Sequence, residues 1–267
     1  MDQSDDERTA YALRGLLSNE SVRYLRSRVK GKGIALNLGL DASRSEIIAC
    51  TDDDCVVPPN WLERMAAAFD GQPRMAAVFG KVDEAAHDAA LGFVPAYRPK
   101  GRRLLTSVFQ KPSMRGMGAC MGVRRSAILA LGGFDPAFGP GGIFPSADDW
   151  EIAVRALLGG FVICETDGVS VVHHGFRTYR EGRALARRDW YAIGAMYAKP
   201  LRTGHWPIIV VALNEFLVYG IWPPLGQLLR LQRPVGFGRS VAFVQGFIRG
   251  LRRPEERTCS RSSTAPS

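Results

Sequence analysis

Three consecutive carboxylates at the end of a short apolar run constrain the fold of this chain more than any other feature. The apolar run Ile47 to Cys50 is followed, after one threonine, by Asp52, Asp53 and Asp54. A short apolar run bounded by polar residues is typical of a buried strand. In an open α/β sheet, ligands bind just beyond the carboxyl ends of the strands. The pattern therefore predicts a strand that delivers three acids to a binding edge.

Two interpretations of this acidic turn remain open. Adjacent carboxylates repel one another unless a cation or another partner neutralises them. Hard oxygen ligands suit Mg or Mn, which typically bridge one or two carboxylates to a substrate phosphate. The turn is then a site for a divalent metal and a diphosphate. Alternatively, it is a solvated acidic turn that caps the helix expected to begin near Pro59.

Composition limits the class of protein. The chain has 267 residues, of which 46% are hydrophobic, enough for one sizeable domain and an appendage. The N-terminus is acidic and polar and shows no secretory signal. The cysteines are odd in number and lack metal-type spacing, which indicates reduced thiols in a cytosolic compartment or small buried apolar residues; they are Cys50, Cys55, Cys120, Cys164 and Cys259.

The net charge of +9 is confined to the C-terminal third. Residues 1–174 carry 20 basic and 21 acidic side chains, whereas residues 175–267 carry 15 and 5. A basic tail suits nucleic acid, an anionic membrane surface or phosphorylated ligands. The sequence has neither zinc-finger spacing nor an aromatic ribonucleoprotein motif. A membrane surface or a phosphate is therefore the expected partner, and nucleic acid is not.

Helical and strand patterns alternate through the first two thirds of the chain. The alternation predicts an α/β sheet that is at least partly parallel. A long segment, residues 92–115, is expected to be loop-rich. Expected helices cover residues 7–19, 34–43, 59–69, 126–131 and 149–158, and expected strands cover 22–25, 47–51, 76–82, 118–123, 161–164 and 169–172.

The tail contains two apolar helical segments. Residues 206–231 are long enough to cross a membrane, but Asn214 and Glu215 lie in the middle, which favours a core or interfacial helix over a span. Residues 237–253 have the pattern of a basic amphipathic helix, which either binds a membrane or packs onto the preceding domain. Residues 254–267 are rich in Ser, Arg and Pro and are expected to be disordered.

A second acidic cluster, Asp148, Asp149 and Glu151, follows a glycine-rich loop and opens the helix expected at 149–158. Carboxylates at a helix N-terminus are favoured by the free backbone amides and the helix dipole. Capping explains one acid but does not require three. If the cluster faces a cleft that holds a metal and a phosphate, one acid can act as a general base on an incoming hydroxyl.

An ordered set of short motifs resembles the family 2 glycosyltransferases, which have the GT-A fold. The matching order and spacing extend from about residue 2 to residue 176. The resemblance rests on Asn37–Gly39, Thr51–Asp54, Gly116–Arg125, Gly132–Asp135, Asp148–Glu151 and Val172–His174. It implies a Rossmann-like mixed sheet flanked by helices, with a C-terminal helical appendage.

The resemblance also implies roles for particular residues. Asp149 corresponds to the catalytic base, and Asp148 replaces a glutamate beside it. His173 or His174 corresponds to a histidine near the metal, the alternative being a strand-end histidine bonded to a loop. The implied metal ligands are Asp54, Asp52 and His173, and the implied nucleotide-sugar-binding residues are Asp2, Asp52, Asp53 and Gly118.

The resemblance implies that the family's opening strand, helix and most of its second strand would precede Met1, so that the sheet would lack its first strand. The expected organisation is a GT-A domain at residues 1–180, a C-terminal helical, membrane-associating region at 181–253 and the tail at 254–267.

The expected activity is inverting transfer of a sugar from a nucleotide-sugar donor to a lipid-linked or polysaccharide acceptor, with Mg or Mn as cofactor. The expected location is cytoplasmic, on the inner face of the plasma membrane. Two alternatives remain, a metal-dependent phosphohydrolase and a non-catalytic remnant.

Overall fold

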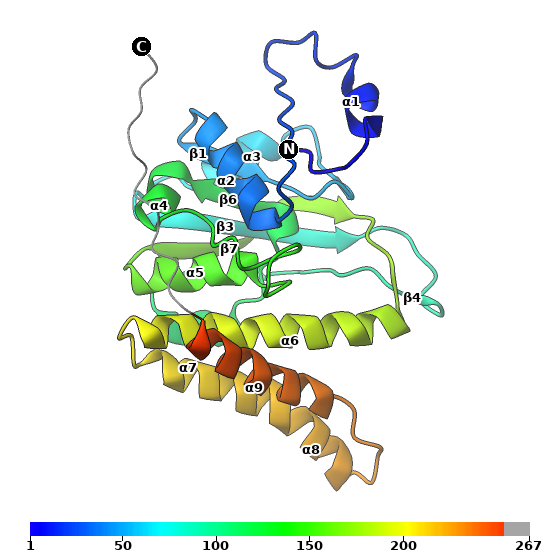
Figure 1. The fold of residues 1–267 in the computed structure, drawn as a ribbon, viewed down its shortest axis with the longest axis vertical. Helices are drawn as coiled ribbons and strands as arrows, with labels where there is room; N and C mark the ends of the chain where they lie inside the picture. Colours follow the sequence, from blue (N-terminus) through cyan, green and yellow to red (C-terminus); the bar gives the residue numbers. More distant parts are fainter. Residues whose placement is uncertain (254–267) are drawn as a thin grey trace.

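The structure of the chain is a computed structural model, and it describes residues 1–253. The tail expected to be disordered, residues 254–267, lies outside the described residues, and so does Cys259. Figure 1 shows a central sheet with helices on both sides, an N-terminal segment at one end and a group of C-terminal helices at the other.

A mixed sheet forms the centre of the molecule. Strands β3 and β7 pair in parallel, and every other pairing in this sheet is antiparallel. This confirms the expected mixed α/β sheet flanked by helices. The strand order is β1 (Ile47–Cys50), β6 (Met121–Arg124), β3 (Met75–Glu84), β7 (Val162–His173) and β2 (Cys55–Val56), and β5 (Arg103–Leu105) also pairs with β7.

Helices cover both faces of the sheet and bury two apolar clusters. On one side α3 (Trp61–Ala67) inserts Met65 against β6, where a Cβ at Gly122 would lie 2.5 Å from the Met65 sulfur. Only glycine lets the helix approach this closely. The other cluster joins the sheet to α4 (Arg125–Ala130), α5 (Asp148–Leu158) and α6 (Tyr179–Arg202). α2 (Lys32–Ala42) packs on the same side through Leu36 and Leu40.

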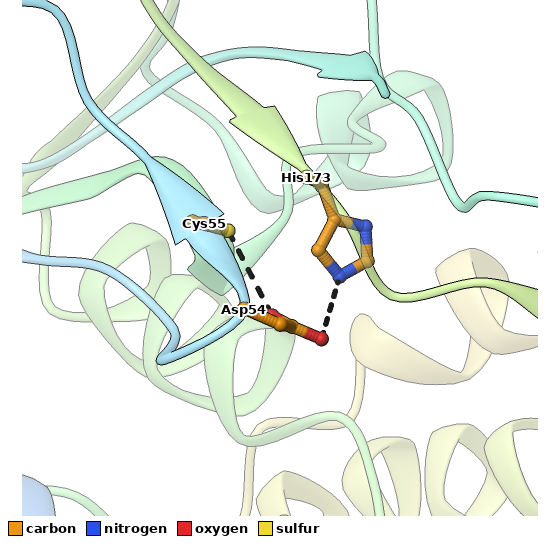
Figure 2. A group of neighbouring side chains, drawn as sticks. All are labelled: Asp54, Cys55 and His173. Carbon is orange, nitrogen blue, oxygen red and sulfur yellow. Dashed lines mark hydrogen bonds and ion pairs between the residues drawn. The ribbon is translucent and has the colours of Figure 1, made fainter. Parts of the chain in front are cut away.

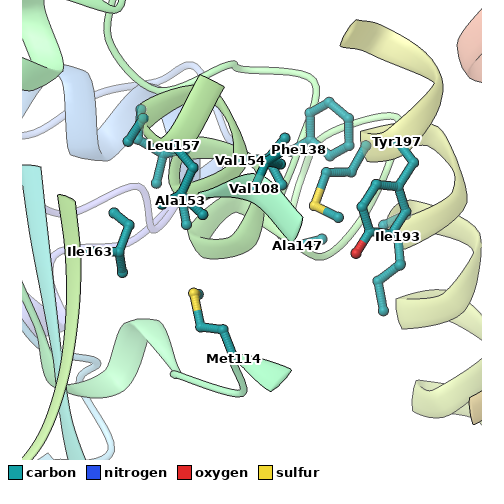
Figure 3. Packing of buried hydrophobic residues seen from close by; sticks show 14 of the residues in the cluster. Val108, Met114, Phe138, Ala147, Ala153, Val154, Leu157, Ile163, Ile193 and Tyr197 are labelled. Carbon is teal, nitrogen blue, oxygen red and sulfur yellow. The ribbon is translucent and has the colours of Figure 1, made fainter. Parts of the chain in front are cut away.

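The C-terminal helices are an integral part of this core. Figure 3 shows Phe138 and Ala147 packed beside Ile193 and Tyr197 of α6, so the apolar cluster runs without interruption from α5 into α6. Below α6 in Figure 1 lie α7 (Ile208–Glu215), the π-helical η3 (Phe216–Ile221), α8 (Trp222–Leu229) and α9 (Phe237–Arg252).

Glycines bring α6 and α9 into close contact. A Cβ at Gly246 would lie 1.8 Å from the Tyr191 carbonyl oxygen, and one at Gly194 would lie 2.0 Å from that of Phe243. Any side chain at either position would force the two helices apart. The face of α9 that packs on the domain consists mainly of small residues and Phe243, whereas Val241, Val244, Ile248 and Leu251 are exposed.

Several sequence predictions were wrong in detail. Residues 22–25 form no strand, and α1 spans only Arg8–Leu13, because this segment buries no helix face that tertiary packing could stabilise. An isolated bridge between Asp2 and Arg26 takes the place of the expected strand. The strands expected at 161–164 and 169–172 are one strand, β7, whose register against β3 shifts near Phe79.

The segment expected to be loop-rich, residues 92–115, contains short ordered elements. Its paired strands and 3₁₀ turns are held against the sheet and α7. These elements are β4 (Gly92–Phe93), which pairs with β8 (Arg177–Thr178), then β5 and η1 (Val108–Ser113), with η2 (Gly118–Cys120) following just beyond.

Candidate active site

Both acidic clusters face one cavity of about 670 Å³ beyond the carboxyl end of β1. Residues from the sheet, from α5 and from α6 contribute to its walls. Most of the site residues predicted from the sequence line it, namely Asp52, Asp53, Asp54, Gly118, Asp148, Asp149 and His173.

Asp149 is held by backbone donors on two sides. The Gly118 amide donates to its Oδ2 and the Trp150 amide to its Oδ1, each at 2.8 Å. A Cβ at Gly118 would lie 3.5 Å from Asp149 Oδ2 and 3.3 Å from the Lys32 ammonium, so the backbone of Gly118 lies directly beside both groups. Ala147, at the N-cap of α5, takes a left-handed conformation (φ 64°), as happens where local strain positions functional groups.

The two adjacent acids, Asp148 and Asp149, have pKa values above those of ordinary carboxylates. Burial, and secondarily the charge of Asp148, raises the pKa of Asp149 to about 7. Burial also raises the pKa of Asp148, whose Oδ2 is buried without a hydrogen-bond partner. A carboxyl with a pKa near neutrality is suited to accept a proton during a reaction. Of the pair, Asp149 has the better-defined orientation.

Lys32 is a site residue that the sequence analysis missed. Its ammonium lies 2.9 Å from Asp52 Oδ1 and 3.8 Å from Asp148 Oδ2, and so links the two acidic clusters. Burial alone would lower the pKa of Lys32, but the surrounding carboxylates raise it, which keeps the lysine charged. The only signal in the sequence was its position at the start of a helix after a glycine-containing loop.

The predicted metal ligands Asp54 and His173 come together, whereas Asp52 is engaged by Lys32. Asp54 Oδ2 lies 3.3 Å from His173 Nε2, and the Pro95 carbonyl oxygen accepts a hydrogen bond from His173 Nδ1 if that nitrogen carries the proton. That leaves Nε2 available as a ligand (Figure 2). Neighbouring donors in an octahedron with bonds of about 2.1 Å are about 3 Å apart. The pair therefore fits a divalent cation such as Mn or Mg.

Cys55 is the third potential ligand of this group. Its sulfur lies 3.9 Å from Asp54 Oδ1, and the ligand atoms of Asp54, Cys55 and His173 all lie within 4.8 Å of one another (Figure 2). Burial raises the pKa of the thiol, which keeps it protonated, and the cysteine does not line the cavity. The donors that face the cavity are thus one carboxylate and one imidazole.

Two acids from the sequence analysis lie elsewhere. Asp2 does not line the cavity; its carboxylate accepts hydrogen bonds from Tyr24 and Ser4, and the Tyr24 bond is the main cause that lowers its pKa to about 2. Glu151 is buried and forms ion pairs with Arg155 and Lys199. The third acid of the α5 cluster therefore fixes α6 to the domain.

Helix α6 supplies a wall that the sequence analysis did not anticipate. The predicted domain boundary at residue 180 separated this helix from the acids. In the structure, four charged or aromatic residues in or next to α6 line the cavity. They are Arg177, just before the helix, and Arg188, Asp189 and Trp190 within it.

The raised pKa of Asp149 predicts a pH-dependent stability of the unliganded protein. The folded chain retains this proton up to about pH 7, while the unfolded chain loses it near 3.8. The stability contributed by the bound proton is complete below pH 4 and is lost as the pH rises through 7. The loss is on the order of 2–4 kcal/mol. In urea denaturation at pH 5 to 8, Asp149→Asn should reduce the slope of the unfolding free energy against pH.

Comparison with known proteins identifies the fold and the family. Two solved structures share the fold: the mannosyltransferase PcManGT from Pyrobaculum calidifontis in complex with GDP-Man and Mn2+ (TM-score 0.56, 18% identity, 94% of this chain and 76% of that one) and S. aureus TarS 1-349 (0.57, 13%, 94% and 70%). The fold is that of the GT-A glycosyltransferases.

The family follows from the sequence. Residues 1–132, about half of the chain, match the family model Glycosyl transferase family 2. The chain belongs to this family. A search of curated proteins gave no match.

Proposed function

We propose that this protein transfers a glycosyl group, with inversion, from a nucleoside diphosphate sugar to an acceptor hydroxyl. The observation that carries the proposal is the meeting of Asp149 with Asp54 and His173 in one cavity. The family match supports transfer as the reaction class. The complex of PcManGT with GDP-Man and Mn2+ supports a nucleotide-sugar donor and a divalent cation.

Each of these residues has its own role in a single displacement reaction at the anomeric carbon. The acceptor oxygen bonds to the anomeric carbon, the bond from that carbon to the diphosphate breaks, and the acceptor proton passes to Asp149. Asp54 and His173 would hold the metal, which stabilises charge on the departing diphosphate. Lys32 adds a fixed positive charge between the two acidic clusters. A single base suffices for inversion because the enzyme forms no covalent intermediate.

Comparing the products formed with and without an added acceptor distinguishes this function from its alternatives. The full-length protein is incubated with UDP- and GDP-sugars and Mn or Mg, with and without a glycan or lipid-linked acceptor extract. A glycosyltransferase releases nucleoside diphosphate and labels the acceptor. A metal-dependent phosphohydrolase would hydrolyse the diphosphate of the donor, to a nucleoside monophosphate and a sugar phosphate, equally well without acceptor. A non-catalytic remnant would not bind the nucleotide in a metal-dependent manner.

The surface of the C-terminal helices supports association with an anionic membrane at the cytoplasmic face. Exposed arginines (Arg230, Arg233, Arg249 and Arg252) accompany a broad apolar surface, and among residues 203–253 the single acid, Glu215, is buried. The exposed apolar side chains are Trp206, Ile209, Val210, Leu213, Leu217, Val218, Trp222, Leu228, Leu229, Leu231, Val235, Phe237, Val241, Val244, Ile248 and Leu251. This surface fits a bilayer with negatively charged lipids and favours a lipid-linked or polysaccharide acceptor.

Peripheral docking fits the structure better than a span. The stretch Ile208–Leu229 is long and apolar enough to cross a membrane. However, Glu215 in its middle forms an ion pair with Arg115 of the domain at 2.7 Å and a hydrogen bond with Tyr197 at 3.3 Å. Withdrawing the helix into lipid would break this pair and leave buried charges without partners.

Charge reversal on α9 should weaken vesicle binding. Because α9 packs closely on α6, truncation would expose the core, so surface substitutions are the cleaner test. Each basic residue near an anionic surface contributes about 1 kcal/mol, so Arg249→Glu with Arg252→Glu should reduce binding at least about 30-fold.

The measurement is flotation with anionic vesicles at low and molar salt. The matched control reverses Arg28 and Arg44, which are exposed in the N-terminal part of the chain. Protein that stays bound in molar salt and at alkaline pH would indicate insertion of residues 208–229. Protein that never floats would mean that this surface does not bind membranes.

A further inference from the structure

A second cavity, of about 280 Å³, adjoins the candidate active site. The two cavities share the side chains of Arg115, Trp150, Trp190 and Ile193, so they meet immediately beside the proposed base. The remaining walls come from the C-terminal helices, namely Glu215 of α7, Tyr219 of η3, Pro223 of α8 and Arg239 of α9. The second cavity therefore exists only because those helices pack against the domain.

Aromatic faces and guanidinium groups make up most of this lining. The Arg115 guanidinium carbon lies 4.0 Å from the centroid of the Tyr219 ring and 5.1 Å from that of Trp150. The Arg239 guanidinium lies 5.6 Å from the Trp190 ring centroid. Guanidinium groups stacked on aromatic rings keep their planar N–H edges available for phosphate oxygens.

The charges of the lining are unbalanced. Glu215 is the single acid among the lining residues, and it is paired with Arg115 Nη1. Arg115 Nη2 is buried with no hydrogen-bond partner, an arrangement that costs stability unless a ligand satisfies the donor. Arg239 has no acidic partner among residues 1–253. The lining thus contains one buried guanidinium nitrogen without a hydrogen-bond partner and one guanidinium group without an acidic partner.

We propose that the second cavity binds a phosphate group carried by the acceptor. The proposal rests on the glycosyl-transfer function proposed above. Arg115 Nη2 and Arg239 bind the phosphate oxygens, and the rings of Trp150 and Trp190 contact the part of the acceptor that leads toward Asp149. The acceptor hydroxyl is thereby brought from the side of the C-terminal helices to the base, while the donor diphosphate occupies the side of Asp54.

Titration calorimetry with two phosphate monoesters tests this site. Full-length protein is first saturated with a nucleoside diphosphate and Mg²⁺, so that the donor side is filled. Octyl phosphate and glucose 6-phosphate are then titrated separately. At least one should bind, and Arg239→Gln should weaken its binding by at least tenfold because a charged hydrogen bond is lost. The control is Arg180→Gln, an exposed arginine on α6 that lines neither cavity.

Each outcome decides between named alternatives. Tighter binding of octyl phosphate would identify a lipid phosphate, and tighter binding of glucose 6-phosphate would identify a soluble or glycan-borne phosphate. Binding of neither ester, or equal affinities in Arg239→Gln and Arg180→Gln, would overturn the proposal. If wild-type protein binds the nucleoside diphosphate but neither ester, the proposed function stands and only this inference fails. If it does not bind the nucleotide, both fail.

Discussion

Asp149→Asn should lower the rate of glycosyl transfer by roughly 10²- to 10⁴-fold while the affinity for the donor changes little, which is the loss expected when a general base is removed. Asparagine has nearly the same size, and its oxygen can still accept one of the two backbone hydrogen bonds that position Asp149. It cannot take the acceptor proton. Single-turnover transfer and calorimetric donor binding, measured on the same preparation, separate the chemical step from binding.

The neighbouring acid provides the control for this result. Asp148→Asn should have the milder effect, because Asp148 is almost fully buried and its nearest cation is Lys32 at 3.8 Å. The wild-type rate should also rise as the pH increases through about 7, since Asp149 must lose its proton before it can act as a base. If Asp148→Asn proves the more damaging of the two, the roles of the two acids are exchanged.

Asp54→Asn should weaken metal-dependent donor binding by about 100-fold or more, given that even residues that only support metal ligands change affinity by 10- to 100-fold. The substitution keeps the shape of the side chain and removes the negative charge next to His173. An amide is a poorer ligand for Mg or Mn than a carboxylate. Calorimetric titration of the donor, with and without Mn²⁺, measures the effect directly.

Cys55 offers a matched control for the metal site. It follows Asp54 in the chain but does not line the cavity, so Cys55→Ala should retain metal-dependent donor binding. Equal losses in both variants would place the metal between the thiol and the aspartate and out of reach of the donor. Unchanged donor affinity and metal requirement in Asp54→Asn would exclude this residue as a ligand.

Local sequence patterns were sufficient to predict the strand and the helix that carry the acids. The apolar run Ile47–Cys50 forms β1, and the acids that follow it line the cavity beyond the carboxyl end of this strand. The α5 helix begins at Asp148, as its acidic first turn and the preceding glycine loop indicated. Failures occurred where local propensity had no tertiary support, as in the absent strand at residues 22–25.

By itself the sequence determined the mixed α/β fold, the acids of the two clusters and the excess positive charge of the C-terminal third. The partners of those acids were decided by the tertiary structure. Lys32 meets Asp52 across 20 residues, and Arg115 meets Glu215 across 100. Periodicity and capping report on neighbours within a few residues, whereas an ion pair depends on how whole helices pack. The second cavity likewise exists because glycines let α9 lie directly on α6, a contact that no local pattern in the chain encodes.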